Sequence, residues 1–306
     1  MFASALAVAL AAQPIVVPLG RPPRQIERLP APIETAGPAW ARACGDSTDW
    51  NQPAPPVRIH GNTYLVGTCG ISAILITGTD GHILIDAGTE QGAEIVAANI
   101  RRLGFKLTDV RYLLFSHEHF DHVGGMARLQ QLTGATLVSS EPARRVLETG
   151  ANHPDDPQAG MHKPFRAATV GRTIRDGGEI RLGNLLLTAM TTPGHTPGAL
   201  SWRWESCDGG VCRTMVYADS LTPISREGYR FSDHPAVVAA FRASIAKIAA
   251  SRCEILLTPH PSASATKERV IGQQPLFDPE GCRTYAAART KQLDERLAKE
   301  AAGNAK

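Results

Sequence analysis

Apolar positions along the chain follow two patterns. Short apolar runs bounded by turn residues predict β-strands, and longer segments with apolar residues three and four apart predict helices. Strands are expected at residues 63–66, 73–77, 83–86, 112–116, 136–139, 185–190, 199–204, 215–218 and 255–258, and helices at 92–103, 125–133, 141–149, 235–250 and 284–302. Strands and helices interleave in two similar halves, which predicts an α/β fold.

The beginning of the chain differs in composition from the rest. Residues 1–12 form an apolar run that ends in small residues, as in the core and cleavage zone of a signal peptide, and it is too short to span a bilayer. No basic segment precedes it, so either the true start lies upstream or the run is an ordinary apolar tail. Residues 13–39, dense in proline and arginine, are expected to be a flexible leader. A single domain is then expected at 40–306, in a protein exported to the periplasm.

Charge gives little support for a macromolecular partner. The formal net charge is only +3, and acidic and basic residues are interspersed along the chain. This balance makes no strong case for nucleic acid or a membrane surface as a partner. We therefore expect small-molecule substrates and a monomer.

Three histidines and an aspartate lie close together directly after the apolar run 112–115, as His117, His119, Asp121 and His122. Imidazole nitrogen and carboxylate oxygen are the ligands of zinc in catalytic sites, where one position stays open for water. His117 and His119, two apart, fall on one side of an extended segment. The glycines after His122 allow a tight turn into a helix, so Asp121 and His122 can face a second metal beside the first.

Two further histidines stand among prolines and glycines after apolar runs. His195 lies in the segment TPGHTPG at 192–198, and His260 lies in TPHP at 258–261. A histidine held in such a turn loses little further entropy when it binds a metal, and loops after strands often carry chemistry. The alternative is that both are ordinary turn histidines, but the cluster upstream favours metal binding.

The motifs HxHxDH, PGHTPG and TPHP together resemble those of the metallo-β-lactamase superfamily. Six segments look like its subclass B3 enzymes, and especially the Adelaide-imipenemase type: 61–64, 67–72, 83–88, 115–119, 217–221 and 259–262. The resemblance extends from about residue 40 to about residue 290. It implies a four-layer αβ/βα sandwich, in which two mixed sheets face each other with helices outside and the metals lie in a cleft at one edge of the sheets.

The resemblance also implies two zinc ions per chain. Its ligand positions correspond here to six residues, which are His117, His119 and His195 for the first zinc and Asp121, His122 and His260 for the second. Other subclasses have a cysteine ligand where this chain has Ser220. Glyoxalase II enzymes use a bridging aspartate in this segment, so Asp219 could be a metal ligand or an acid behind the ligands, and we favour the acid.

The activity implied by the resemblance is hydrolysis of the ring amide of β-lactam antibiotics, namely penicillins, cephalosporins and carbapenems. Zinc lowers the pKa of a bound water to about 7, so a zinc-bound hydroxide is available at neutral pH to attack the lactam carbonyl. The first zinc would stabilise the oxyanion, and the second would meet the departing nitrogen. Asp121 would bind the second zinc and orient the nucleophile, and His122 and His260 would complete the catalytic set.

Further positions follow from the resemblance. Ser220 and Thr222 match hydroxyls near the β-lactam carboxylate, and Gln158 matches a glutamine at the mouth of the cleft, unless it is an exposed loop residue. Asp86 resembles an acid that orients a ligand histidine by accepting its second ring proton. The remaining histidines are not expected to bind metal, although the third and fourth could lie on the rim near Gln158: His60, His82, His153, His162 and His234.

Six cysteines in an exported chain invite disulfides, although the sequence alone leaves 15 pairings. Local spacing predicts one pair, Cys207 with Cys212, which can close a hairpin-like loop across two glycines. The resemblance implies the other two pairs, Cys44 with Cys69 and Cys253 with Cys282. The alternative is six buried thiols, which would suit a cytosolic protein.

Three functions are compatible with the sequence. A zinc-dependent β-lactamase is favoured. Another hydrolase of the same fold, such as a thioesterase of the glyoxalase II type or a lactonase, is the main alternative, because a fold does not determine a substrate. A thioesterase would be expected to be cytosolic and to rely on Asp219. A non-catalytic zinc-binding module is the third.

Overall fold

The computed structural model describes residues 36–303. The signal-like segment 1–12 and residues 13–35 of the expected leader lie outside the described residues, as do residues 304–306. Helix α1 (Ala36–Cys44) begins before residue 40, within the last part of the expected leader. The domain boundary at residue 40 therefore stays a prediction.

Two mixed sheets form the centre of the described part of the chain. The seven-stranded sheet follows chain order: β1 (Val57–His60), β2 (Thr63–Leu65), β3 (Ile74–Thr77), β4 (His82–Ile85), β5 (Val110–Leu114), β6 (Thr136–Ser139) and β7 (Val170–Thr173). Its neighbours are antiparallel from β1 to β4 and parallel from β4 to β7.

The second sheet has five strands in the order β12-β11-β10-β9-β8. Their bounds are β8 (Glu179–Leu182), β9 (Leu185–Thr191), β10 (Leu200–Asp208), β11 (Val211–Tyr217) and β12 (Ile255–Leu257). Only β11 and β12 pair in parallel, so the sheet is mixed like the first.

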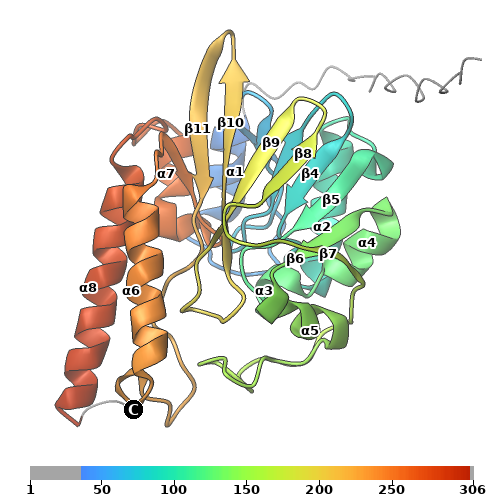
Figure 1. The fold of residues 1–306 in the computed structure, drawn as a ribbon. Helices are drawn as coiled ribbons and strands as arrows, with labels where there is room; N and C mark the ends of the chain where they lie inside the picture. The colour runs from blue at the N-terminus through green and yellow to red at the C-terminus, as the bar shows by residue number, and fades with distance from the viewer. Residues whose placement is uncertain (1–35, 304–306) are drawn as a thin grey trace, which may run out of the picture.

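Helices cover the outer faces of both sheets, as Figure 1 shows. On the seven-stranded sheet these are α2 (Glu90–Arg102) and α4 (Met126–Thr133), and on the five-stranded sheet α6 (Pro235–Ala250) and α8 (Gly281–Ala301). Shorter helical segments lie in the connections: α3 (Phe120–Val123), α5 (Glu141–Thr149), α7 (Thr266–Val270), η1 (Leu107–Asp109), η2 (Phe231–Asp233) and η3 (Pro261–Ser264). The predicted four-layer αβ/βα sandwich is confirmed.

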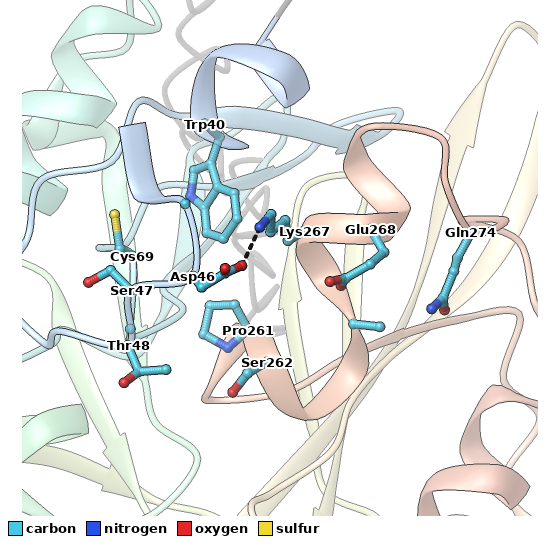
Figure 2. A pocket seen from close by; sticks show the side chains of 13 residues that line it. Trp40, Asp46, Ser47, Thr48, Cys69, Pro261, Ser262, Lys267, Glu268 and Gln274 are labelled. Atoms are coloured by element: carbon cyan, nitrogen blue, oxygen red, sulfur yellow. Dashed lines mark hydrogen bonds and ion pairs between the residues drawn. The ribbon is translucent and has the colours of Figure 1, made fainter. Parts of the chain in front are cut away.

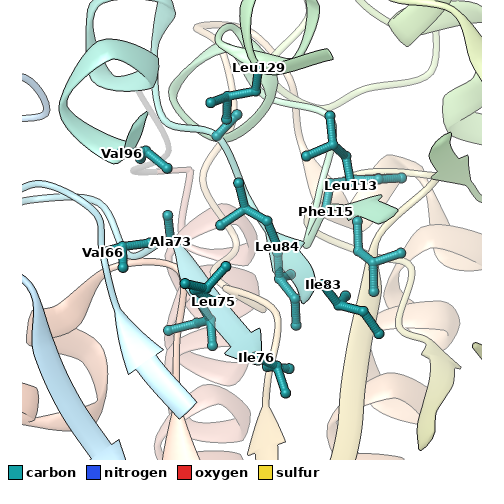
Figure 3. Packing of buried hydrophobic residues seen from close by; sticks show 14 of the residues in the cluster. Val66, Ala73, Leu75, Ile76, Ile83, Leu84, Val96, Leu113, Phe115 and Leu129 are labelled. Carbon is teal, nitrogen blue, oxygen red and sulfur yellow. The ribbon is translucent and has the colours of Figure 1, made fainter. Parts of the chain in front are cut away.

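The main core lies around the central strands of the first sheet. Every residue of β3 and β4 is buried, as expected of strands covered on both faces. Figure 3 shows Val96 of α2 and Leu129 of α4 beside the strand residues Leu84 and Leu113. On the opposite face, the second sheet closes the core with tryptophans, and Trp202 Nε1 donates to the carbonyl oxygen of Phe115 at 2.8 Å.

The strands that the sequence pattern missed are β1, β7 and β8, and each lies at the edge of its sheet. Edge strands expose one side, and β7 buries only its first residue. Too few apolar residues remain for a pattern to be recognised. By contrast, the expected helices 141–149 and 235–250 and the strand 136–139 coincide with α5, α6 and β6.

All three predicted disulfides are present, between Cys44 and Cys69, Cys207 and Cys212, and Cys253 and Cys282. The first joins the end of α1 to the loop after β2. The second closes the β10–β11 hairpin, and the third joins the segment before β12 to the start of α8.

Strand direction brings several strand ends to one edge of the sandwich. Parallel pairing aligns the carboxyl ends of β4 and β5 in the first sheet and of β11 and β12 in the second. Because β9 is separated from β11 by one antiparallel strand, its carboxyl end lies at the same edge. Loops after strands are where scaffolds present functional groups, so this edge is the expected place for a site.

Candidate metal centre

The six predicted metal ligands all lie in segments that follow these strand ends. His117 and His119 come directly after β5, and His119 precedes the first residue of α3. Asp121 and His122 belong to α3, a short helix that was not predicted, and the expected turn into a helix at the glycines is also present, because Gly125 is the N-cap of α4. The two remaining ligands, His195 and His260, follow β9 and β12.

Three histidines form the first group of donors. One ring nitrogen each of His117, His119 and His195 lies within 4.8 Å of the others. The ring centroids are 4.6 to 4.9 Å apart, and all three residues are buried. Three imidazoles converging at this spacing can hold one metal ion and leave a fourth position open.

Each of these rings is oriented by a partner on its other nitrogen. His117 Nδ1 lies 2.8 Å from Asp219 Oδ1, and His119 Nε2 lies 3.0 Å from an oxygen of Asp156. His195 Nδ1 donates to the carbonyl oxygen of Thr222 at 2.8 Å. Such hydrogen bonds determine which nitrogen of a ring remains available to a metal.

Asp121 and His122 form the second group, with His117 between the two groups. Asp121 Oδ2 lies 3.1 Å from His122 Nε2 and 3.5 Å from His260 Nε2. The other ring nitrogen of His260 donates to the carbonyl oxygen of Gly70 at 3.1 Å. A carboxylate and two imidazoles therefore meet beside the first group.

Asp86 lies behind His122, with an oxygen 3.4 Å from Nδ1 of that ring. Its carboxylate also accepts hydrogen bonds from the backbone and hydroxyl of Ser116, at 2.7 and 2.8 Å, and from the Tyr217 hydroxyl at 2.7 Å. Asp86 has a φ of 64°, a strained backbone conformation for a residue other than glycine. The orienting role of this acid stays a prediction, because its oxygen faces the His122 ring without a hydrogen bond within residues 36–303.

Charge in the site favours cation binding. Burial lowers the pKa of His117 well below its ordinary value and lowers the pKa of His195 to about 3, with the neighbouring histidines adding to both shifts. Burial alone would raise the pKa of Asp121, but His122 and His260 beside it lower that pKa overall. Neutral imidazoles and an ionised carboxylate are the forms that bind a metal, so His122, whose pKa is raised to about 10 by Asp121 and Asp86 against the effect of burial, must release a proton when a metal binds.

Comparisons with known proteins agree with this geometry. A family model described as "Metallo-beta-lactamase superfamily" matches residues 66–247. The solved structure of the MIM-2 metallo-beta-lactamase is 55% identical to this chain, with a TM-score of 0.83 over 87% of this chain and 98% of that one. The chain belongs to the metallo-beta-lactamase superfamily.

Further relatives place it in subclass B3 of the metallo-beta-lactamases, as predicted. MIM-1 from Novosphingobium pentaromativorans is 47% identical over 87% of this chain and 99% of that one, with a TM-score of 0.85. MEM-A1, a subclass B3 metallo-beta-lactamase from a soil metagenome library, is 42% identical over 83% of this chain and all of that one, with a TM-score of 0.79.

Curated relatives match over shorter segments. A hydroxyacylglutathione hydrolase of Rhodopseudomonas palustris (strain BisB18) is 30% identical over 122 residues, which are 40% of this chain and 38% of that protein. The chain thus spans less than half the length of this relative.

The donor set of this metallo-beta-lactamase fits zinc. Nitrogen and oxygen donors in two adjoining groups are the chemistry that zinc takes in catalytic sites. Both ring nitrogens of His122 are buried without a hydrogen-bond partner among the described residues, although Asp86 and Asp121 lie close. A metal ion would satisfy the nitrogen that faces Asp121.

The predicted substrate contacts lie around the same centre. Ser220 Oγ and Gln158 Nε2 are buried, and within residues 36–303 neither has a hydrogen-bond partner. Gln158 is 5% exposed, so the alternative of an exposed loop residue is wrong. Thr222 Oγ1 lies 3.2 Å from His195 Nδ1, beside the first group.

Of the other histidines, His162 lies near the centre. Its ring centroid is 5.7 Å from that of His119 and 5.8 Å from that of Trp50, which supports a place on the rim. His82 lies outside this centre, as the first residue of β4, and is buried with its ring 4.9 Å from that of Phe105.

Three residues that shape the site were missed from the sequence. Glu118, buried between two ligand positions, accepts from the Thr196 hydroxyl at 2.6 Å and from the Gly198 backbone at 2.7 Å. Glu118 thereby joins the segment of His117 and His119 to the loop that carries His195. Asp156 orients His119, as described above, and the Tyr285 hydroxyl of α8 lies 2.6 Å from the carbonyl oxygens of both Asp219 and Ser220. Of these three residues, only Glu118 could have been recognised from the sequence, because its carboxylate stands between two ligand histidines.

Proposed function

We propose that this protein is a zinc-dependent β-lactamase that hydrolyses the ring amide of penicillins, cephalosporins and carbapenems. One observation carries the proposal, the convergence of six nitrogen and oxygen donors in two adjoining groups at the common edge of the sheets. The kinship with MIM-2, MIM-1 and MEM-A1 supports it, since each of these proteins is named a metallo-beta-lactamase.

The two groups would hold one zinc ion each. His117, His119 and His195 would bind the first zinc, through the ring nitrogens that Asp219, Asp156 and Thr222 leave available. Asp121, His122 and His260 would bind the second zinc, and this assignment is supported by the short distances from Asp121 Oδ2 to both rings.

Zinc in such a site polarises a carbonyl group and makes a water nucleophilic at neutral pH. The protein side chains would then orient the reactants. Asp121, ionised beside two imidazoles, would hold the attacking water through the oxygen that it does not present to the second zinc. Ser220 and Thr222 would donate to the substrate carboxylate, and the Gln158 amide would contact the substrate at the mouth of the cleft.

The position of Asp219 argues against the thioesterase alternative. Its Oδ1 lies 2.8 Å from Nδ1 of His117, on the side of the ring away from the nitrogen that would bind zinc. An acid in this place orients a ligand, whereas the thioesterase interpretation needs it between the two metals. The match to a hydroxyacylglutathione hydrolase covers only 40% of this chain.

We further propose that the protein is a periplasmic monomer whose catalytic domain comprises residues 40–306. Three disulfides support an oxidising compartment, where such bonds persist. Across residues 36–303, no helix combines the length and apolar character needed to cross a membrane.

The test is the rate at which the purified, zinc-loaded protein opens a penicillin, a cephalosporin and a carbapenem, with and without EDTA. We expect turnover that EDTA abolishes and added zinc restores. A protein that binds zinc but opens none of the three rings would refute the proposal. Turnover of a glutathione thioester or a lactone under the same conditions would then assign it to another hydrolase class.

A further inference from the structure

We infer that the Cys44–Cys69 disulfide is a positioning element for the second zinc, because it holds the backbone carbonyl that orients His260. The inference rests on the proposed two-zinc site and extends it to a part of the chain with no metal ligand. Three steps connect the disulfide to the metal.

The first step is the contact between His260 and the loop after β2. His260 Nδ1 donates to the carbonyl oxygen of Gly70 at 3.1 Å, which turns Nε2 toward Asp121. A second bond, from the backbone nitrogen of Ser72 to the carbonyl oxygen of Pro259, joins the same two loops at 2.7 Å. The orientation of the His260 ring therefore depends on where the loop 67–72 lies.

The second step is the attachment of that loop to the N-terminal segment. Cys69, next to Gly70, is bonded to Cys44 at the end of α1, and both cysteines are buried. The backbone nitrogen of Gly70 donates to the carbonyl oxygen of Asp49 at 3.0 Å. A Cβ atom at Gly70 would approach the Thr48 carbonyl oxygen to 2.2 Å, so the two backbones touch closely at this point.

The third step is a pocket that borders the loop at Cys69 and Gly70. This pocket, of about 370 Å³, is also lined by residues of α1, the loop 45–48 and the segment that follows His260. Figure 2 shows Trp40 and Cys69 on one wall of this cavity and Pro261 and Ser262 on another. The ion pair that crosses it, Asp46 with Lys267, has an almost fully exposed carboxylate and contributes little. All six residues of the loop 67–72 are buried, so the pocket is the side on which the Gly70 carbonyl would have room to move.

The disulfide should therefore affect one metal and not the other. The histidines of the first group obtain their orienting partners from Asp219, Asp156 and Thr222, none of which lies in the loop 67–72. The imidazole of His260 loses its partner if Gly70 moves into the cavity. Loss of a partner that orients a ligand typically weakens metal affinity about 10- to 100-fold.

The experiment is a zinc titration of metal-free protein against a chromophoric chelator, with Co(II) spectra as a second readout. In the Cys44→Ala/Cys69→Ala variant we expect the first zinc to bind as in the wild type and the second to bind about 10- to 100-fold more weakly. The matched control is Cys207→Ala/Cys212→Ala, which removes an exposed disulfide from the β10–β11 hairpin and should leave both affinities unchanged.

Two results would overturn the inference: wild-type affinity for the second zinc, or equal weakening of both. Should the double variant fail to fold, Gly70→Ala decides, because it displaces the same carbonyl by crowding Thr48 while the disulfide stays intact. Selective loss of the second zinc in that variant supports the inference, and retention refutes it. The readout needs no β-lactam, so a wild type that binds two zincs without opening the ring would refute only the proposed substrate.

Discussion

The two halves of the metal centre are built from similar donors and differ most at one histidine, His260. In the first group, His117 and His119 are oriented by the carboxylates of Asp219 and Asp156, His195 is oriented by the backbone carbonyl of Thr222, and the side chains of this group are at most 6% exposed. In the second group, the side chain of His260 is 35% exposed and is oriented by the backbone carbonyl of Gly70.

The difference follows from where the segments lie. The residues of the first group follow the ends of buried strands. Glu118 accepts two hydrogen bonds from the loop that carries His195 and so holds this loop beside the other two histidines. The second group depends on the loop 67–72, which borders a cavity. A ligand buried among packed neighbours is held more rigidly than a partly exposed one, so we expect a tight first site and a more easily perturbed second site.

Loss of a metal ligand should have the largest effect in either half. His119→Ala and Asp121→Ala should each reduce kcat/KM for a β-lactam at least about 100-fold, because a metal in such a site contributes several kcal/mol to catalysis. Far-UV circular dichroism should show that most of the fold remains. His60→Ala is the control, since that histidine lies at the end of β1 and contacts the Val211 carbonyl oxygen of the β10–β11 hairpin. Undiminished turnover in either ligand variant would refute the assignment.

Glu118 tests the rigidity of the first half. Glu118→Ala leaves the hydroxyl of Thr196 and the backbone nitrogen of Gly198 without their acceptor, and we expect about 10- to 100-fold weaker binding of the first zinc. Glu118→Gln can accept from one partner and donate to the other, so it should restore most of the affinity if position matters. If glutamine behaves like alanine, the negative charge matters instead. Glu148→Ala, on the exposed side of α5, is the control.

Graded removal of zinc tests the comparison directly. As a chelator is added, the second zinc should leave before the first, with affinities that differ by at least about tenfold, the effect expected for one weaker orienting partner. Co(II)-substituted protein distinguishes the two sites by their absorption spectra. Simultaneous loss of both ions, or earlier loss from the three-histidine group, would show that exposure and packing do not determine which site binds zinc more tightly.

The smallest expected effect is at the substrate carboxylate. Thr222→Ala should raise KM about two- to tenfold with little change in kcat, because one hydrogen bond contributes about 0.5–1.5 kcal/mol and acts in the ground state. His195 should stay in place, since its shorter contact in this residue is the backbone carbonyl oxygen at 2.8 Å, against 3.2 Å to the hydroxyl that is removed. Thr222→Ser keeps the hydroxyl and should behave as wild type. A fall in kcat alone would contradict this role.

Much of the fold could be predicted because its signals are local. Apolar runs placed all the central strands, and periodicity placed the long helices α2, α4, α6 and α8 to within a few residues. The edge strands β1, β7 and β8 were missed, since one exposed face leaves little pattern to detect. The short helix α3 was also missed, and it places Asp121 and His122 in its first turn, before the glycines that lead into α4.

The site was predictable in its donors but only partly in their supports, because Asp86 and Asp219 were expected behind the ligands whereas Asp156 and Tyr285 were not. Histidine and aspartate at short spacing have a chemical meaning that needs no fold. Asp156 gave no such signal, since a carboxylate in a polar loop resembles any surface acid until the loop is placed against His119. The same holds for Tyr285, which reaches two backbone carbonyls of the site from the last helix.

The sequence by itself determined which groups can bind zinc, the class of fold and the hairpin disulfide, because each depends on residues close together in the chain. Only the tertiary structure decided which nitrogen of each ring faces the metal. That choice depends on partners as distant as Asp219 for His117, 102 positions apart, and Gly70 for His260, 190 positions apart. Packing of the two sheets brings these pairs together, and no local pattern specifies them.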